Sequence, residues 1–207
     1  MRTSNISEFD FLIIDESNKD IIFSELVCNI TKDLILPKGY LIKAIPGCKI
    51  NLRNSAHIIS YSPLLFYGNT DSIISFTSSD FTGQGIVVFN CEQTSILSYV
   101  NFTNLSSVSA SGWSLRGAIS FYESPIDIAN CNFSNNIRGD DYLNIIRTNF
   151  TIVNTSFNFT KADALDSDYC KGAIKNVKFN QIGNDGIDVS GTRLFIDQVE
   201  IINPGDK

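Results

Sequence analysis

The sequence lacks several features that would point to common functions. Its 207 residues include one histidine, one tryptophan and one methionine. The apolar run at residues 11–14 has only four residues, too few to span a membrane or to form the core of a secretion signal. The net charge is −6 and the lysines and arginines do not cluster, so the basic footprint that binds nucleic acid is missing. We therefore expect neither membrane insertion nor a nucleic-acid partner.

Cysteine and helix signals are equally sparse. The five cysteines are odd in number and none stands in a CxxC pair, which argues against a zinc site. We interpret them as small buried apolar residues. No segment combines a sustained helical periodicity with capping residues, so the sequence predicts almost no helix.

What the sequence does contain is a repeat of 22 residues in its last third. Residues 141–144 (DYLN), 163–166 (DALD) and 185–188 (DGID) follow one another at that spacing. Three further positions repeat with them: Ile152, Ile174 and Ile196; Asn154, Asn176 and Gln198; Phe157, Phe179 and Ile201. A fixed period of this length with one apolar residue per position is typical of a solenoid, in which each repeat forms one coil.

The repeat continues upstream with wider spacing. Residues 128–133 match residues 152–157, 24 positions later, and Leu97 and Phe102 match Ile128 and Phe133 at a spacing of 31. The additional residues fit one long loop at about residues 103–116, since loops grow at small entropic cost.

The composition of the coils favours a parallel β-helix. Each coil holds two or three short β-like runs, separated by Asn, Asp, Gly and Ser. The dense leucine pattern of leucine-rich repeats is absent, and helical repeats have longer periods. We expect Asn130, Asn154 and Asn176 to stack at one corner. An inward column should contain Phe102, Phe133, Phe157 and Phe179. Burial of each ring should contribute about 2–3 kcal/mol.

Two segments carry a resemblance to a known group of proteins. Residues 34–47 (LILPKGYLIKAIPG) are similar to the opening coil of bacterial right-handed parallel β-helix proteins, and residues 117–122 (GAISFY) with 128–135 are similar to their internal repeat. The resemblance to this pectate-lyase-like superfamily implies right-handed coils over residues 33–207. The superfamily contains polysaccharide lyases, uronate epimerases, polygalacturonases, phage tailspikes and adhesins without catalytic activity.

The ends of the chain complete the expected organisation. We interpret residues 1–32 as an N-terminal strand-rich cap or edge segment. The chain stops where the next coil would begin, and solenoids need a polar cap. We therefore expect the β-helix to continue past Lys207, or to contact further coils there.

Alternation of side chains along a strand places the acidic residues on the outside. If Leu143, Leu165 and Ile187 point inward, then Asn144, Asp166 and Asp188 form an outward column. A second outward column contains Tyr122, Ile146, Asp168 and Ser190. Because neighbouring coils lie about 4.8 Å apart, the carboxylates in one column are close enough to require solvent, a shared proton, a cation or a basic neighbour.

Three interpretations of these columns remain open. The aspartates would stabilise turns through bonds to backbone amides. Alternatively, they would form a face that binds polysaccharide or calcium, for which Asp163, Asp166, Asp185 and Asp188 are the candidate metal ligands, with Asp168 beside them. The third interpretation is glycan catalysis.

The catalytic interpretation rests on a second, local resemblance. Residues 184–189 (NDGIDV) are similar to a polygalacturonase motif, which implies that Asp185 and Asp206 match two catalytic carboxylates. Lys207 stands where the third would be, and the downstream motifs of that family are absent, so hydrolysis is in doubt. Asp166 and Asp188 are the other candidate catalysts.

The functional expectation joins these residues to one aromatic side chain on the long loop. Trp113 would either stack on a sugar ring or fold down over the solenoid, and its large apolar surface favours the second. We list Trp113, Tyr122, Asn144, Asp166, Asp168 and Asp188 as candidate ligand-binding residues. The chain is expected to be an extracellular or cell-surface module that binds polysaccharide or serves an adhesive role. The alternative is a lyase, epimerase or glycoside hydrolase; no cofactor is required, although calcium would fit.

Overall fold

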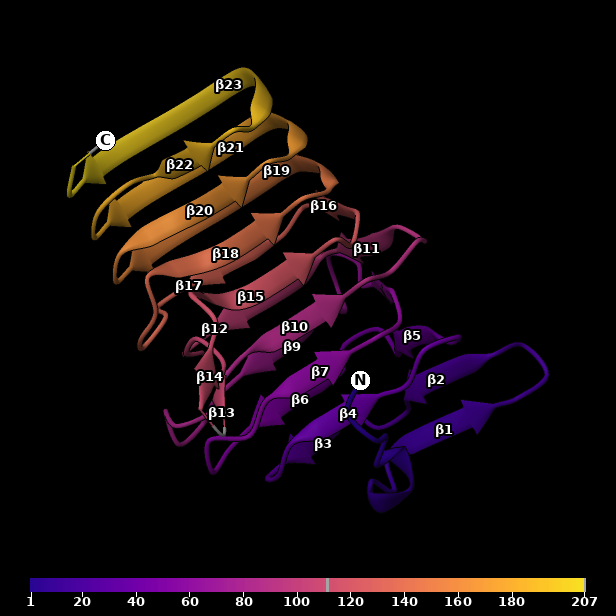
Figure 1. Ribbon diagram of the computed structural model, residues 1–207. Helices are drawn as coiled ribbons and strands as arrows, with labels where there is room; N and C mark the ends of the chain where they lie inside the picture. Colours follow the sequence, from indigo (N-terminus) through magenta and orange to yellow (C-terminus); the bar gives the residue numbers. More distant parts are fainter. Residues whose placement is uncertain (111, 207) are drawn as a thin grey trace.

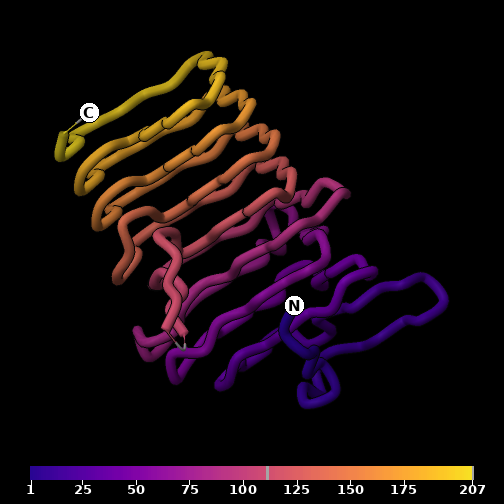
Figure 2. The backbone as a smooth tube through the Cα atoms, viewed as in Figure 1, coloured from indigo at the N-terminus to yellow at the C-terminus, as the bar shows by residue number. Residues whose placement is uncertain are grey.

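The computed structural model describes residues 1–110 and 112–206, and it is a parallel β-solenoid of about eight turns (Figure 1). Strands account for 59% of the residues. The described residues contain one helical element, the 3-10 turn η1 (Ile6–Glu8). The predictions of an all-β parallel β-helix and of almost no helix are therefore confirmed. The tube view shows the coils stacked one above another from the N-terminal to the C-terminal end (Figure 2).

One wall of the solenoid is a parallel sheet of seven strands, one from each of seven coils. In spatial order these are β4 (Leu34–Leu36), β7 (Ile58–Ser60), β10 (Ile86–Phe89), β15 (Gly117–Tyr122), β18 (Asp141–Ile146), β20 (Asp163–Asp168) and β22 (Ile187–Ser190). Figure 1 shows this sheet toward the viewer.

The other two walls belong to one sheet of fourteen strands. The second wall contains β2 (Asp20–Phe23), β5 (Leu41–Ala44), β8 (Leu64–Tyr67), β11 (Ser95–Ser98) and β16 (Ile126–Ala129). The third contains β3 (Val27–Ile30), β6 (Lys49–Leu52), β9 (Ile74–Thr77), β12 (Val100–Thr103) and β17 (Asn132–Ser134). In the last coils the two walls are joined within single strands, namely β19 (Asn149–Thr160), β21 (Lys171–Ile182) and β23 (Arg193–Pro204). The edge strand β1 (Leu12–Asp15) pairs with β2 in the antiparallel direction.

The corners are made by residues in the left-handed region of φ. The corner between the second and third walls has Asn130, Asn154, Asn176 and Gln198 at φ values of 50–55°. Asparagine tolerates this conformation better than most residues. The Asn176 amide donates to Asn154 Oδ1 at 2.8 Å, and the Asn154 amide donates to Asn130 Oδ1 at 3.4 Å. The predicted asparagine column is confirmed.

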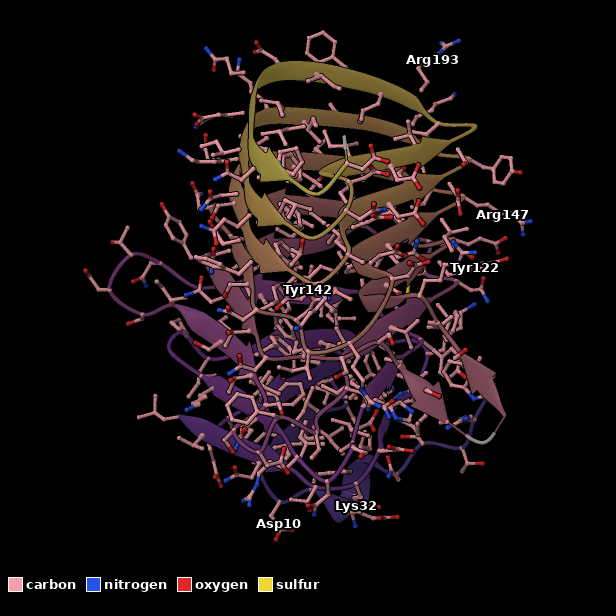
Figure 3. The ribbon with its side chains drawn as sticks, turned by 90° about the vertical axis from the view of Figure 1, so that its left-hand side faces the viewer. Asp10, Lys32, Tyr122, Tyr142, Arg147 and Arg193 are labelled. Carbon is pink, nitrogen blue, oxygen red and sulfur yellow. The ribbon has the colours of Figure 1, made fainter. Side chains whose placement is uncertain are left out.

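The core is organised in equally regular columns. Phe102, Phe133, Phe157 and Phe179 are stacked with ring centroids 4.7–5.0 Å apart, as predicted, and Phe76 extends the column by one coil. Leu143, Leu165 and Ile187 lie in register on the first wall. Figure 3 shows Tyr142 in the interior, where its hydroxyl donates to the Ser134 carbonyl at 2.8 Å. All five cysteines are free and buried.

Two segments depart from the regular coils. Within residues 1–32, β2 and β3 already pair in parallel with β5 and β6, so the stacked sheets extend into that segment. The long loop predicted at residues 103–116 contains a small antiparallel hairpin, β13 (Ser109–Ala110) and β14 (Trp113–Ser114).

Candidate functional site

The outward side of the seven-stranded sheet, hereafter the outer face, has one column of side chains that crosses all seven strands. The column begins with the apolar residues Ile35, Ile59 and Val87 and continues with Ser120, Asn144, Asp166 and Asp188. The chemistry of the outer face therefore changes from apolar to polar between β10 and β15. The registers confirm that Asp166 and Asp188 are neighbours in one column.

The middle of the polar half is more enclosed than the sequence suggested. Asn144 and Asp166 were expected to be open to ligands, but only 3% and 5% of their surfaces are exposed. The Asn144 amide donates to Asp166 Oδ2 at 2.9 Å, and this bond compensates part of the cost of burying the carboxylate. Burial, with smaller effects from Asp168 and Asp188, raises the pKa of Asp166 to about 6.

Asp141 lies at the start of β18, in register with Asp163 of β20. It is the most enclosed carboxyl group of this region. Its exposed fraction is 1%, and Oδ2 has no hydrogen-bond partner among the described residues. Burial raises the pKa of Asp141 to about 8, and the charge of Asp166 adds to the increase. Asp141 therefore holds a proton at neutral pH. The guanidinium of Arg116 lowers the pKa of both Asp141 and Asp166, by less than burial raises it.

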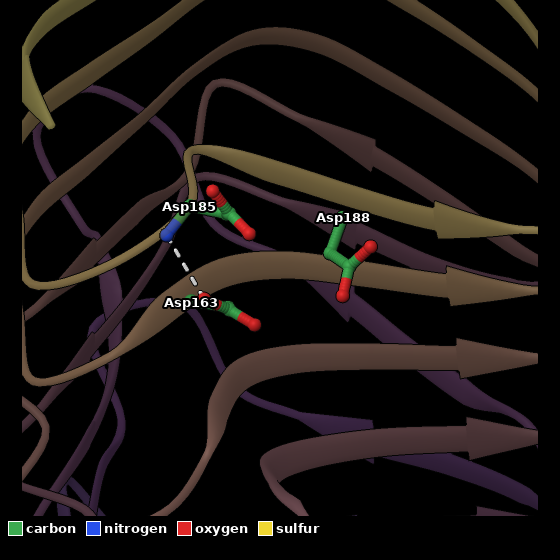
Figure 4. Close-up of side chains that lie close together, drawn as sticks. All are labelled: Asp163, Asp185 and Asp188. Carbon is green, nitrogen blue, oxygen red and sulfur yellow. Dashed lines mark hydrogen bonds between the residues drawn. The ribbon is translucent and has the colours of Figure 1, made fainter. Parts of the chain in front are cut away.

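Three carboxylates converge at the last two coils of the outer face (Figure 4). One ligand atom from each of Asp163, Asp185 and Asp188 lies within 4.8 Å of the other two. Asp163 is buried, Asp185 is half-buried and Asp188 is exposed, so the group opens to solvent on one side. Carboxylate oxygens are the ligands that calcium prefers, and this arrangement brings together three of the four predicted metal candidates. Asp166, the fourth, is bound to Asn144 instead.

The same group also stabilises the backbone. Asp163 Oδ1 accepts hydrogen bonds from the backbone N–H of Asp185 at 2.9 Å and from the Asn184 amide at 2.7 Å. These bonds tie one coil to the next, as expected if the aspartates stabilise turns. Thus one oxygen of Asp163 has a structural role, and the structural and cation-binding interpretations apply to different atoms of the cluster.

Asp206 does not belong to this cluster of three carboxylates. Asp206 is exposed in the segment after β23, where its backbone N–H donates to the Asn184 carbonyl at 3.0 Å. It is not among the carboxylates grouped with Asp185. The expectation for Lys207 lies outside the described residues.

A groove of about 450 Å³ lies beside the enclosed carboxylates. One side is formed by Ser114, Leu115 and Arg116 of the hairpin segment. The other side carries Asn144, Ile146, Asp168, Tyr169 and Ser190 from the first wall and its corner. The groove thus presents a carboxylate, hydroxyl groups, a guanidinium and an aromatic ring to a single ligand, whereas the Asn144 amide is engaged with Asp166.

Of the predicted ligand-binding residues, Asn144 and Asp168 line this groove, and the other four, Trp113, Tyr122, Asp166 and Asp188, lie outside its lining. Tyr122 lies at the edge of the outer face, where its hydroxyl accepts a hydrogen bond from Arg147 at 2.7 Å. Trp113 packs against the apolar half of the outer face, and its ring meets the His57 ring edge-on at 6.2 Å. The guanidinium of Arg2 lies 5.2 Å from the centre of the Trp113 ring. These contacts agree with the covering role that the sequence favoured.

Sequence reasoning did not identify Arg116 and Tyr169 as groove residues. Arg116 is close to the carboxylates because it directly precedes Gly117, the register partner of Asp141, and its guanidinium contacts Asp140 at 3.3 Å. Tyr169 was detectable, since it follows Asp168 directly at the end of β20. Its place at a corner, with φ of 55°, directs it toward the groove.

Comparisons with protein-family models, curated proteins and solved structures found no match for this chain. Among the described residues, no helix is long and apolar enough to cross a membrane.

Proposed function

We propose that the chain is a β-helix module that binds polysaccharide in the groove between the hairpin and the outer face. The observation that carries the proposal is the set of polar and aromatic groups that line the groove, with Asp168 and Ser190 on rigid strands and Arg116 and Tyr169 beside them. Rigid placement favours recognition of a repetitive polymer, because little conformational entropy is lost on binding. Such a module would act at the cell surface or outside the cell, in binding or adhesion.

The acidic neighbours of the groove restrict the glycans that would bind. Asp163, Asp185 and Asp188 create a negative potential that would repel a bare uronate polymer. A calcium ion held by this cluster would reverse that effect and bridge to a uronate carboxylate. A neutral glycan would bind without the ion.

A second candidate function is polysaccharide modification, of the kind found in the pectate-lyase-like superfamily. It is favoured by the pKa of Asp166, which burial raises to about 6, close to the range of a general acid. Against it, Asp166 has only 5% of its surface exposed and is bound to Asn144. We therefore rank glycan binding first.

Calorimetry with neutral and uronate oligosaccharides, each with and without calcium, tests the proposal. The variant Asp168→Ala should weaken binding of both ligands, because Asp168 lines the groove. The variant Asp188→Asn should weaken only the calcium-dependent binding of uronate. Asp197→Asn is the matched control, since Asp197 lies on β23 and pairs with Lys175 at 3.0 Å.

The outcomes separate the two functions. Binding that is the same in Asp168→Ala and in wild type would reject the groove as the binding site, and absence of any binding would leave the aspartates with a structural role. Release of new sugar ends on incubation with polymer, and its loss in Asp166→Asn, would establish the enzyme instead.

A further inference from the structure

A trough follows the corner between the first and second walls in the last three coils. It consists of two adjoining hollows of about 370 and 540 Å³ that share Asn149 and Lys171. The lining includes the cationic residues Arg147, Lys171 and Arg193 and the aromatic residues Tyr169 and Phe195. In Figure 3 Arg147 and Arg193 lie along the same edge of the molecule, above Tyr122.

The trough concentrates positive charge in an acidic chain. Lys171 and Arg193 are direct register partners on β21 and β23, so consecutive coils each contribute one cation. Neither residue takes part in an ion pair within residues 1–110 and 112–206. Arg147 contacts Glu123 at 3.8 Å and donates to Tyr122, which orients its guanidinium. No carboxylate lines either hollow in the described part of the chain.

Exposed aromatic rings accompany these cations. Tyr169 and Phe195 have 68% and 65% of their surfaces exposed, although large apolar side chains are usually more protected. A Cβ added at Gly191 would come within 2.7 Å of Cδ1 of Tyr169, so glycine allows this ring to lie flat over the backbone. Ala173 is small and separates Thr151 from Phe195 along the same outward column, which leaves the hollow open.

We propose that this corner trough binds the anionic groups of a linear glycan, either sulfate or carboxylate, independently of the groove on the outer face. Arginine and lysine bind such groups through charge-assisted hydrogen bonds, and the flat rings would pack against the sugar faces. Cations on successive coils lie about 4.8 Å apart, which suits a polymer that runs along the solenoid. The net charge of −6 repels any polyanion at long range, so binding must rest on these local contacts, and nucleic acid is tested below as the other linear polyanion.

Binding of dextran sulfate, polygalacturonate and uncharged dextran at 0.15 M salt tests the trough. In calcium-free buffer we expect the two anionic polymers to bind the trough and dextran not to compete with them for it. The double variant Lys171→Gln/Arg193→Gln should lower the affinity at least tenfold, and Phe195→Ser about threefold. The matched control is Lys175→Gln/Lys178→Gln, which removes the same charge from β21, the strand that also carries Lys171. Its two lysines are already paired with Asp197 and Glu200 at 3.0 Å, so we expect little change.

Three outcomes would overturn the proposal: equal losses in the two double variants, absence of binding by the wild type, or tighter binding of single-stranded DNA of matched length. The relative affinities of dextran sulfate and polygalacturonate identify the preferred anion. Calcium-free buffer and the variant Asp168→Ala separate this site from the groove, since trough binding should persist in both. Circular dichroism would verify that each variant is folded.

Discussion

The two halves of the outer face share a backbone but differ in chemistry. In the first half, Ile35, Ile59 and Val87 form an apolar patch on which Trp113 and Leu115 pack. In the second half, the same column carries Asn144, Asp166 and Asp188, and the hairpin segment lies beside a groove. An outward position on a solenoid strand is thus free to be either a covered apolar contact or an open polar surface. The difference lies in what covers the strands, because their pairing is the same.

Substitutions in the core behind the two halves should give the largest losses in the free energy of unfolding. Phe76 lies behind the apolar half and Phe157 behind the polar half, and both are fully buried in the same column. Phe76→Ala and Phe157→Ala should each lower the free energy of unfolding by about 3–5 kcal/mol through cavity formation. Urea unfolding measures both. A loss below about 1 kcal/mol in either would show that the column is not a continuous core.

Exchanging the chemistry of the two halves should have unequal effects. Ile59→Asp would place a carboxylate beneath the covering segment and should cost about 3 kcal/mol of unfolding free energy. The reciprocal change, Asp188→Ile, is at an exposed position and should alter stability by less than about 0.5 kcal/mol. Similar costs for the two variants in urea unfolding would mean that the halves are covered to the same extent.

The two enclosed aspartates of the polar half should make stability depend on pH in the neutral range. An unfolded aspartate titrates near a pKa of about 3.9, whereas burial raises the pKa of Asp141 to about 8 and that of Asp166 to about 6. The folded chain therefore binds more protons than the unfolded chain between about pH 4 and pH 8. The contribution of this pair should be fully present below about pH 4 and should decline as the pH rises through 6 and then 8, by up to about 1.4 kcal/mol for each unit by which burial raises a pKa.

Urea unfolding at pH 5 and at pH 8 measures this dependence for these groups. Asp141→Asn cannot ionise and should remove most of the difference between the two values. Asp197 lies on the opposite side of the last coils, so Asp197→Asn should retain the difference in stability between the two pH values. An unchanged pH dependence in Asp141→Asn would show that Asp141 is not the protonated group.

Trp113, which covers the apolar half, should make the smallest measurable contribution to the free energy of unfolding. Trp113 is half-buried against Ile59 and its neighbours, so Trp113→Ala should cost about 1–2 kcal/mol. Hydrogen exchange should become faster in β7 and β10 and remain unchanged in β20. Faster exchange in β20 instead would indicate that the hairpin holds the polar half.

The sequence by itself was sufficient for the fold of the last coils. The 22-residue spacing places Phe179 above Phe157 and Asp188 beside Asp166, because parallel strands in register must align equivalent positions. The same logic placed Asn154 and Asn176 at one corner, where a left-handed φ suits asparagine. The repeat also brought together the cluster of Asp163, Asp185 and Asp188.

Only the tertiary structure decided how those aspartates are used. Alternation along a strand indicates that Asp166 points outward, but it cannot show that Asn144 caps it and that neighbouring groups bury it. The pKa of Asp141 depends on that enclosure, and the groove depends on a hairpin without a repeat partner. Periodic spacing determines the contacts between coils, because parallel strands in register repeat the same contacts in each coil. Burial and cover are determined by irregular segments, whose positions follow from long-range packing.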